Sequence, residues 1–568
     1  MPLDLNILIG GAAGQGVHAI STPLAKSLVR AGAWVVVTQD YQSRIRGGHI
    51  FNVLRVADTP LAGPREGVDL LVALNQETVA LHLPELAPGG VIIYDAATVK
   101  ELPPGVTAVG LSLADLLPGT AAGEIAVNAG ASGALLGLLQ VPVAGLAEML
   151  AESFAAKGEE VAEWNRRAAT RGWELARAVA YPHSLAHLTP PDPPRLFISG
   201  HEALALGALM AGLTFISGYP MTPWTSLFNA IGQRALKYGV VLEQAEDEIC
   251  AINMAIGASY AGARAMTGTS GGGFCLMTEA VGLAAMTETP LVVVVAQRPG
   301  PSTGLPTRTS QGDLQFVLWA GQDDSPRAVL APGSPAQGFS LALKAFDLAE
   351  RYQTPVFILT DQFFADSQHT CRPEDFVARP VPMAVELKPA GGVYERYALT
   401  ESGISPRRLP GFGPELVVAD SDEHTPDGHL TEDLEIRVKM HEKRLRKLTG
   451  LAREMRGLTT LGDPEAPLVL LCWGSSRGPV SEAVSRLAAQ GVAARMVHLS
   501  ELWPFPREAV VEALKGARKL VAVEQNASGQ LNRLLRQETG LMAAHAVRRY
   551  DGRPFTPEYI LRGLSGVV

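Results

Sequence analysis

Between about residues 196 and 375, short apolar runs alternate with longer helical patterns, and this alternation restricts the possible folds more than any other feature. The apolar runs are TFISG, VVLEQ, ARAMTGT, LVVVVAQ, RAVLA and PVFILT, and each has the length of one strand. Strands that alternate regularly with helices indicate βαβ units. The segment therefore predicts an α/β domain.

The same alternation continues toward both ends of the chain. Residues 1–187 contain the runs LNILIGG, AWVVVTQ, VDLLVALN and VIIYDA between helical patterns, and they predict a parallel α/β sheet. The proline cluster LTPPDPPR at 188–195 cannot continue a helix or a strand, so it marks a linker. Residues 376–465 predict an irregular arm followed by a charged linker helix, and residues 466–568 return to a smaller βαβ pattern. The fold class is multidomain α/β.

The composition favours a soluble cytoplasmic protein. The chain of 568 residues is 47% hydrophobic, yet no apolar run approaches the roughly 18 residues of a membrane span. The first residues lack the basic segment of a signal peptide. A net charge of −9 provides no electrostatic footprint for nucleic acid. The four cysteines are far apart and match no iron–sulfur or disulfide spacing, so we expect buried free thiols.

Polar loops follow the expected strands of residues 196–375 at their carboxyl ends, where open α/β sheets bind ligands. They read SGYPMTPWTS, EQAEDEIC, TGTSGGG and AQRPGPSTGLPTRTSQGDL. In the first loop, Pro220 and Pro223 restrict the backbone around Thr222, which predicts a preset hydroxyl. Taken singly, the acids could complement a helix dipole, the glycines open a helix, and the arginines lie on the surface. Their convergence on one sheet edge favours a binding site.

A second glycine-rich loop, GGAAGQGV, follows the first expected strand. Its backbone amides at a helix start predict an anion site, although the glycines do not match the dinucleotide-binding pattern. Asp40 ends the next strand, where a ribose-binding acid could lie. Arg44, Arg46 and Arg55 follow, so an anionic ligand or a partner surface is a better interpretation than NAD.

In chain order, the segments GGAAGQGV, QSRIRGGH, GYPMTPWT, EDEICAINMAIGASYAGARAMTGTSGGG and GPSTGLPTRTSQGDL resemble the 2-oxoacid:ferredoxin oxidoreductase family. The resemblance covers essentially the whole chain and is greatest to the alpha subunits of the 2-oxoglutarate enzymes. It implies a gamma-type domain, a thiamine-diphosphate-binding pyrimidine-type domain and a transketolase C-terminal-like domain, in that order. It also implies oxidative decarboxylation of 2-oxoglutarate to succinyl-CoA, with electrons passed to ferredoxin.

The resemblance implies roles for individual residues. Glu248 would hold N1' of the thiamine pyrimidine ring, with Glu246 as the alternative, and a carboxylate in this role must be shielded from water. Thr222 would hydrogen-bond the oxygens of the substrate. The other implied contacts are Tyr219, Pro220, Thr269 and Ser270 to the cofactor, Arg298, Thr307 and Arg308 to the substrate, and Arg44 and Arg46 to coenzyme A. Met221 and Trp224 depart from the family's usual loop, which changes the shape expected for the pocket.

The chain lacks the Gly-Asp-Gly segment with which thiamine enzymes hold Mg²⁺ and the diphosphate. The resemblance therefore implies that a beta subunit supplies Mg²⁺, the diphosphate half of the site and a [4Fe-4S] cluster. It also implies coenzyme A as cosubstrate, an (alpha beta)₂ heterotetramer and a place in the reductive tricarboxylic acid cycle. Glu524, Asn526 and Gln530 of the VEQNASGQL segment are expected to serve assembly more than chemistry.

Two other interpretations remain open from the sequence. The same chemistry could act on pyruvate, a branched-chain 2-oxoacid or indolepyruvate, because the missing subunit partly decides substrate length. Alternatively, the chain could be a non-catalytic subunit whose glycine loop binds a nucleotide.

Overall fold

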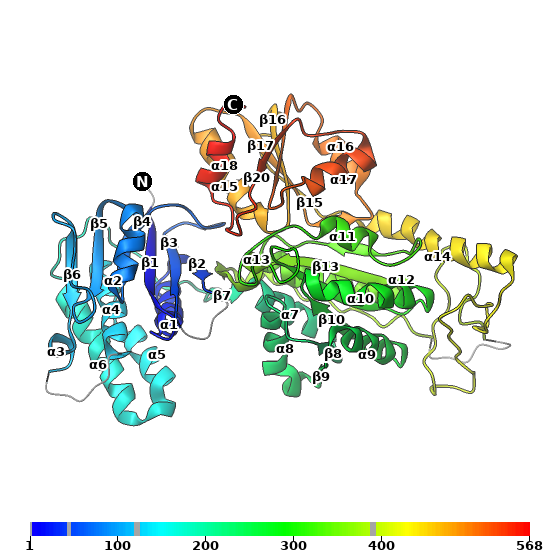
Figure 1. Ribbon diagram of the computed structural model, residues 1–568, viewed down its shortest axis with the longest axis horizontal. Coiled ribbons are helices and arrows are strands. Elements are labelled where there is room, and N and C mark those ends of the chain that lie inside the picture. The colour runs from blue at the N-terminus through cyan, green and yellow to red at the C-terminus, as the bar shows by residue number, and fades with distance from the viewer. Residues whose placement is uncertain (1–2, 43–46, 119–124, 387–393, 568) are drawn as a thin grey trace. The chain divides into compact units, whose positions relative to one another are not determined.

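The computed structural model describes residues 3–42, 47–118, 125–386 and 394–567 and divides into two compact units (Figure 1). The first unit comprises Met1–Ile198 and Ser367–Glu374, and the second comprises Ser199–Asp366 and Asp375–Val568. No helix within the described ranges has both the length and the apolarity that crossing a lipid bilayer requires.

The first unit contains an eight-stranded sheet in the order β6-β5-β4-β1-β3-β2-β14-β7. Its strands are β1 (Asp4–Ala12), β2 (Trp34–Asp40), β3 (His49–Ala57), β4 (Val68–Ala73), β5 (Leu86–Asp95), β6 (Thr107–Leu111), β7 (Leu196–Ser199) and β14 (Gln368–Cys371). The expectation of a parallel sheet is wrong here, because β3 runs antiparallel to both β1 and β2. A connection as short as the one between β2 and β3 carries no crossover helix, so the chain must reverse.

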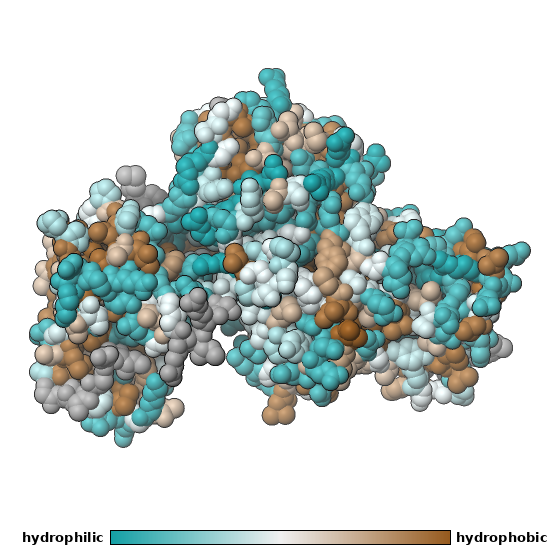
Figure 2. Space-filling model, in the orientation of Figure 1, coloured by the Kyte–Doolittle hydropathy of each residue, from teal (hydrophilic) through white to brown (hydrophobic). Residues whose placement is uncertain are grey.

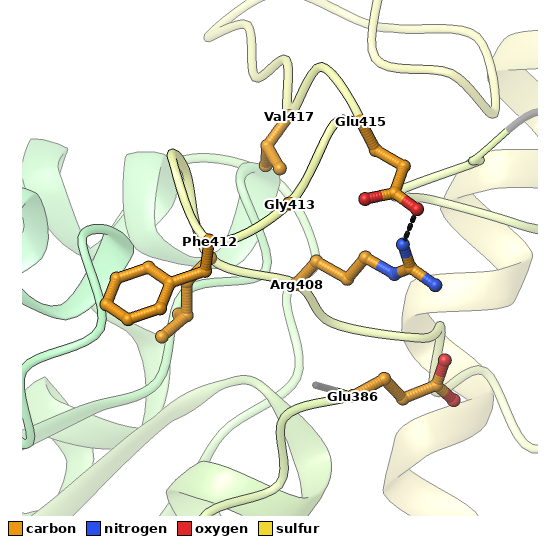
Figure 3. Close-up of a pocket in the computed structure, with 7 residues that line it drawn as sticks. Glu386, Arg408, Phe412, Gly413, Glu415 and Val417 are labelled. Carbon is orange, nitrogen blue, oxygen red and sulfur yellow. Dashed lines mark ion pairs between the residues drawn. The ribbon is translucent and has the colours of Figure 1, made fainter. Parts of the chain in front are cut away.

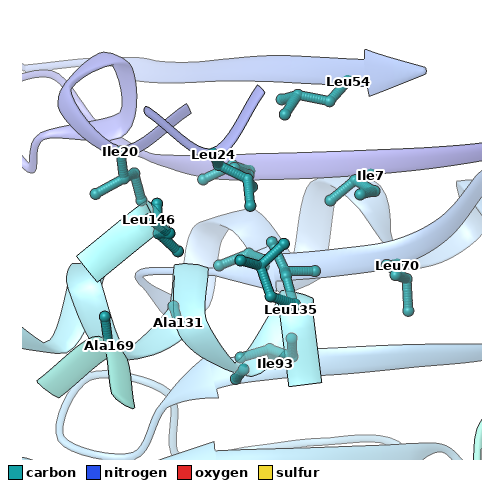
Figure 4. Close-up of a cluster of buried hydrophobic side chains, with 14 of the residues drawn as sticks. Ile7, Ile20, Leu24, Leu54, Leu70, Ile93, Ala131, Leu135, Leu146 and Ala169 are labelled. Atoms are coloured by element: carbon teal, nitrogen blue, oxygen red, sulfur yellow. The ribbon is translucent and has the colours of Figure 1, made fainter. Parts of the chain in front are cut away.

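Helices cover this sheet and enclose its core. They are α1 (Val17–Arg30), α2 (Gln76–His82), α3 (Leu113–Leu116), α4 (Ile125–Leu138), α5 (Ala144–Phe154) and α6 (Glu159–Ala176). Figure 4 shows strand residues such as Ile7 and Ile93 packed against Leu24 of α1 and Leu135 of α4. α4 and α6 approach so closely that a Cβ on Gly172 would lie 2.0 Å from the carbonyl oxygen of Gly130.

Residues 367–374, which the sequence pattern predicts to lie in the second domain, return to the first sheet. Strand β14 pairs antiparallel with β2, and the Val35 backbone N–H donates to Oγ1 of Thr370 over 2.9 Å. This pairing joins positions more than 300 residues apart in the chain, a contact that local sequence patterns do not encode.

The second unit is built on a seven-stranded sheet in the order β18-β12-β13-β11-β10-β8-β9. Six strands are parallel, namely β8 (Phe215–Gly218), β9 (Val241–Gln244), β10 (Ala265–Thr269), β11 (Leu291–Gln297), β12 (Ala328–Leu330) and β13 (Pro355–Asp361). The seventh, β18 (Glu501–Trp503), joins antiparallel from the C-terminal part of the chain. The predicted order of strands and helices is present.

Helices cover both faces of this sheet. They are α7 (Gly200–Met210), α8 (Thr225–Tyr238), α9 (Glu248–Tyr260), α10 (Gly271–Met286), α11 (Leu314–Trp319), α12 (Pro335–Tyr352) and α13 (Gln362–Asp366). Val292 and Val294 of β11 pack in one core with α7, α8 and α12, whereas Val293 and Val295 pack in another with α9 and α10. All four cysteines are free, but the expectation that they are buried holds only for Cys472, and Cys275 on α10 is exposed.

An arm without helices or long strands occupies the described residues between 376 and 433 and leads into α14 (Leu434–Glu454). Figure 3 shows a small pocket in this arm, where Arg408 forms an ion pair with Glu415 and Phe412 lies on the other side of the loop. The surface over α14 is mostly hydrophilic (Figure 2).

The buried side of α14 is fixed by an ion triad. Fully buried Lys443 and Lys447 each lie 2.6 Å from a carboxylate oxygen of Glu288, two residues after the end of α10. Burial alone would raise the pKa of Glu288, but the two lysines and Arg396 hold it at about 2. The carboxylate is therefore charged at neutral pH, and it fastens α14 to the sheet domain.

The chain ends in a five-stranded sheet in the order β15-β17-β16-β19-β20. Its strands are β15 (Leu458–Gly462), β16 (Leu468–Trp473), β17 (Ala494–Leu499), β19 (Lys519–Glu524) and β20 (His545–Arg548), and its helices are α15 (Arg477–Ala489), α16 (Arg507–Ala513), α17 (Gln530–Thr539) and α18 (Pro557–Gly563). Trp473 and Leu499 of this sheet share a hydrophobic core with α9 and α10, so this part packs firmly within the second unit.

Candidate functional site

The loop after β8 lies at the carboxyl edge of the parallel sheet in the second unit. Tyr219 in this loop is 39% exposed, Pro220 is exposed and Thr222 is half-buried. The peptide bond between Thr222 and Pro223 is cis. The loop therefore places short polar and aromatic groups at the edge where β10 and β11 also end.

Trp224 and Met221 occupy different positions. Trp224 is fully buried, and Cβ atoms on Gly218 and Gly268 would lie 2.9 and 2.3 Å from its ring atoms. The sulfur of Met221 instead lies 3.6 Å from the hydroxyl of Thr269. The tryptophan therefore changes packing within the core, whereas the methionine contacts a residue of the candidate site.

Glu248 is the first residue of α9 and is only 3% exposed, whereas Glu246 is exposed on the preceding loop. Oε1 of Glu248 accepts a hydrogen bond of 3.5 Å from Oγ1 of Thr269. A Cβ on Gly273 of α10 would lie 2.5 Å from the same oxygen, so glycine is needed for this close packing. The structure thus shields the Glu248 carboxylate from water, whereas the Glu246 carboxylate is solvated.

Asp247, which lies between Glu246 and Glu248, is the residue that caps α9. The Asp247 side chain accepts a hydrogen bond of 2.7 Å from the backbone N–H of Cys250, which caps α9. The carboxylate of Glu248 is therefore not required for this cap.

Thr269 is the last residue of β10 and Ser270 links it to α10, and both are completely buried. The hydroxyl of Ser270 has no hydrogen-bond partner among the described residues, and it does not cap the helix that it precedes. A buried hydroxyl without a partner costs roughly 1–3 kcal/mol. A polar ligand group at this point would remove that cost.

Arg298 follows β11 and joins the end of that strand to the β8 loop. Its Nη1 donates a hydrogen bond of 2.7 Å to the carbonyl oxygen of Thr222. Burial lowers the pKa of Arg298, and the nearby Asp313 acts against that shift. The structure therefore brings together two residues that the sequence predicted separately.

Asp313 is a residue of this site that sequence reasoning missed. Its Oδ2 is buried without a hydrogen-bond partner among the described residues and would lie 2.6 Å from a Cβ on Gly271, at the start of α10. Burial raises the pKa of Asp313 to about 6, and Arg298 acts in the opposite direction. Asp313 is part of the TRTSQGDL segment, which the sequence marked as a polar loop, but nothing in the spacing of that segment singled out the aspartate.

The same loop carries Thr307, which is buried, and Arg308, which is half-buried. A Cβ on Gly552 would lie 2.9 Å from Cβ of Arg308, so the C-terminal part of the chain packs against this side of the loop. This packing does not test the substrate contacts expected of Thr307 and Arg308. Their roles stay predictions.

Gln311 fixes this loop to the C-terminal sheet. Its Nε2 donates to the carbonyl of Trp473 over 2.9 Å, and its Oε1 accepts from the Gln525 backbone N–H over 2.9 Å and from Ser476 Oγ over 3.2 Å. Nδ2 of Asn526 also donates to the Gln311 carbonyl over 3.1 Å. The VEQNASGQL segment therefore holds the loop after β11 in place within the chain, and the assembly role expected of it stays a prediction.

In the first unit, the glycine loop after β1 is held by Gln15. Its Oε1 accepts from the backbone N–H of Ala12 over 2.6 Å, and its carbonyl accepts from Asn128 over 2.6 Å. Arg44 and Arg46 lie outside the described residues. Arg55 is not part of an anion site, because it is buried and forms a 2.7 Å ion pair with Asp4.

Three family models match the chain in succession. Residues 206–443 match pyruvate flavodoxin/ferredoxin oxidoreductase, thiamine diphosphate-binding, residues 6–175 match pyruvate ferredoxin/flavodoxin oxidoreductase, and residues 466–560 match pyruvate:ferredoxin oxidoreductase core domain II. The alpha subunit of 2-oxoacid:ferredoxin oxidoreductase 2 from Aeropyrum pernix is 34% identical over 97% of this chain and 96% of its own length. The chain belongs to the 2-oxoacid:ferredoxin oxidoreductase family.

Two further relatives have similar coverage. The 2-oxoglutarate oxidoreductase subunit KorA of Mycobacterium tuberculosis is 32% identical over 99% of this chain and 91% of its own length. A solved 2-oxoglutarate:ferredoxin oxidoreductase from Magnetococcus marinus, with 2-oxoglutarate, coenzyme A and succinyl-CoA bound, superposes with a TM-score of 0.91 at 34% identity and 99% coverage of both chains. The resemblance stated from the sequence is confirmed, and the chain is similar to alpha subunits of this family.

Proposed function

We propose that this alpha subunit acts in the CoA-dependent oxidative decarboxylation of 2-oxoglutarate to succinyl-CoA, with electrons passed to ferredoxin. The observation that carries the proposal is the convergence of a buried carboxylate, Glu248, with the Thr222–Arg298 pair at one sheet edge. The Magnetococcus marinus enzyme, whose chain superposes on this one throughout, was solved with 2-oxoglutarate, coenzyme A and succinyl-CoA.

The residues at the start of α9 and α10 fit the pyrimidine half of thiamine diphosphate. Glu248 offers a water-shielded carboxylate for N1' of the ring, and the orphaned hydroxyl of Ser270 offers a second polar contact. Thr269 is buried beside Glu248 and orients its carboxylate, while Tyr219 and Pro220 border the site. When bound, the cofactor supplies the carbon that makes loss of CO₂ from a 2-oxoacid possible.

The substrate side is assigned to Arg298 and Thr222. Arg298 can pair with the carboxylate beside the 2-oxo group through a charge-assisted hydrogen bond, and Thr222 can donate its hydroxyl to a substrate oxygen. Because Arg298 already holds the Thr222 backbone, both groups keep a fixed relative position before substrate arrives. Thr307 and Arg308 remain assigned to the distal part of the substrate, where Arg308 would meet the second carboxylate of 2-oxoglutarate.

The proposal requires a partner. A beta subunit would hold Mg²⁺, the diphosphate and a [4Fe-4S] cluster, because no Gly-Asp-Gly segment occurs in this chain. Relatives named as alpha subunits support a multi-subunit enzyme, which we propose is an (alpha beta)₂ heterotetramer that reduces ferredoxin. Arg44 and Arg46 remain the proposed contacts to coenzyme A.

We assign domains as the resemblance implies. Residues 1–187 form the gamma-type domain, 188–195 the linker, 196–375 the pyrimidine-binding domain, 376–465 the arm and linker helix, and 466–568 the transketolase C-terminal-like domain, except that residues 367–374 join the sheet of the gamma-type domain. The separate family matches to residues 6–175, 206–443 and 466–560 support three successive domains, although the match to 206–443 runs across the boundary at 375.

The test is purification of the native complex, with thiamine and iron assayed and dye reduction compared on 2-oxoglutarate, pyruvate, 2-oxoisovalerate and indolepyruvate. We expect thiamine, iron and a preference for 2-oxoglutarate. A preference for another 2-oxoacid would change the substrate and keep the chemistry. A complex without thiamine would instead favour a non-catalytic nucleotide-binding subunit.

A further inference from the structure

A closed ring of hydrogen bonds passes behind the candidate site and joins the loops that carry Thr222 and Arg298. Its bonds are Arg298 Nη1 to Thr222 O at 2.7 Å, Ser226 Oγ to Pro223 O at 3.0 Å, His201 Nδ1 to Ser226 Oγ at 2.7 Å, His201 Nε2 to Thr360 Oγ1 at 2.9 Å, and Gln297 Nε2 to Thr360 O at 3.1 Å. The peptide links Thr222–Pro223 and Gln297–Arg298 close the ring. It therefore ties together the ends of β8, β11 and β13 and the start of α7.

His201 is the centre of this ring. It is completely buried on α7, and burial lowers its pKa to about 3. The imidazole is therefore neutral at physiological pH, with one nitrogen that donates a hydrogen bond and one that accepts. Both nitrogens have partners in the ring.

Counting protons assigns the direction of each bond. The hydroxyl proton of Ser226 goes to the Pro223 carbonyl, so Ser226 Oγ must accept from His201 and the proton on the imidazole lies at Nδ1. Nε2 is then the acceptor, and the Thr360 hydroxyl donates to it. Every donor in the ring has one acceptor, and no proton is used twice.

We propose that His201 is a positioning residue that holds Thr222 and Arg298 as one rigid unit for the reaction. The inference rests on the proposed function, because it takes these two residues as the groups that meet the substrate. The physical gain is preorganisation, since groups fixed before binding need not reorganise during reaction. His201 acts only through Ser226 and Thr360, because both of its ring nitrogens are occupied by them.

The test opens the ring at different points in the holoenzyme. His201→Phe removes both bonds, while Ser226→Ala and Thr360→Val each remove one with little change in volume. The matched control is Thr354→Val at the opposite end of β13, where a buried hydroxyl donates to the Pro326 carbonyl over 2.7 Å outside the ring. kcat is measured per bound thiamine, together with KM for the 2-oxoacid.

We expect each ring variant to lower kcat/KM by about 10- to 100-fold, with changes in both kcat and KM. The Ser226→Ala, Thr360→Val double variant should lose little more than either single variant, because a ring opened once is already open. Thr354→Val should leave kcat per bound thiamine and KM unchanged. A purely structural role would lower only the melting temperature, and that result in the ring variants would overturn the proposal, as would an equal loss in the control.

A second readout separates this inference from the proposed function. Amide hydrogen exchange of the isolated chain follows the peptides around residues 219–226 and 297–308 without cofactor or substrate. Opening the ring at Ser226 should accelerate exchange in both segments, although Ser226 lies in only one of them. Acceleration confined to 219–226 would overturn the coupling. If exchange accelerates in both segments but the complex contains no thiamine, the ring is supported and the proposed function is rejected.

Discussion

The hydroxyl of Thr269 donates to Oε1 of Glu248 over 3.5 Å, so the end of one strand orients a carboxylate at the start of a helix. Both residues are buried, and Gly273 leaves room for the carboxylate between α9 and α10. A carboxylate that must hold a ring nitrogen in place requires this combination of fixed orientation and exclusion of water.

Replacing Glu248 with glutamine should lower 2-oxoacid-dependent reduction of a viologen dye by at least about 100-fold, because the amide cannot take the carboxylate's role. Size-exclusion chromatography should show an intact complex. Glu246→Gln is the matched control, and its activity should stay within about twofold of wild type, since the side chain is solvated. The opposite pattern would assign the role to Glu246.

Arg298→Ala should raise KM for the 2-oxoacid and lower kcat/KM. The loss should correspond to about 2 to 3 kcal/mol of transition-state stabilisation, because a charge-assisted hydrogen bond is removed. Steady-state kinetics on 2-oxoglutarate and pyruvate provide the measurement. Arg308→Ala should weaken the binding of 2-oxoglutarate more than that of pyruvate, because only 2-oxoglutarate has a distal carboxylate. An unchanged KM in Arg298→Ala would show that another residue binds the carboxylate beside the 2-oxo group.

Asp313→Asn should change how stability depends on pH. Burial raises the pKa of Asp313 to about 6, so the folded chain holds a proton that the unfolded chain has lost, and wild-type stability falls as pH rises from about 4 through 6. The asparagine variant lacks this loss. Relative to wild type, its free energy of unfolding should therefore rise by about 2 kcal/mol between pH 4.5 and pH 7. Denaturant unfolding of both proteins at pH 4.5 and 7 tests this. An equal difference between the proteins at the two pH values would show that Asp313 is ionised throughout.

Gln311→Leu should destabilise the chain by about 2 to 4 kcal/mol, because it leaves the Trp473 carbonyl and the Gln525 N–H buried without partners. Thermal unfolding measures the loss, with the exposed Gln322→Leu as the control. KM for the 2-oxoacid should rise as well, since the loop after β11 is no longer held. An unchanged melting temperature would show that water replaces these bonds at little cost.

Much of the second unit could be predicted from the chain alone. The apolar runs at β8 through β13 specified the strands, and the proline-rich and glycine-rich loops at their ends marked Thr222, Glu248 and Arg298 as neighbours at one edge. The sequence could not choose between two glutamates near the start of α9 as the shielded carboxylate. Glu246 and Glu248 are equivalent in sequence, and only the start of α9 buries one of them.

The rest depended on contacts between distant positions. A parallel sheet was expected for the first unit, but β3 reverses and β14 joins from more than 300 residues away. Asp313 and His201 gave no local signal, because their significance comes from what surrounds them. Gln311 meets residues 162 and 214 positions further along the chain.

The sequence by itself determined the alternating elements, the family and the chemical groups at the strand ends, because these follow from local composition and short-range spacing. The tertiary structure alone decided which carboxylate is shielded, which loops are tied together and which polar groups remain unpaired. Burial and hydrogen-bond geometry are properties of the packed chain, so residues far apart in sequence define them jointly.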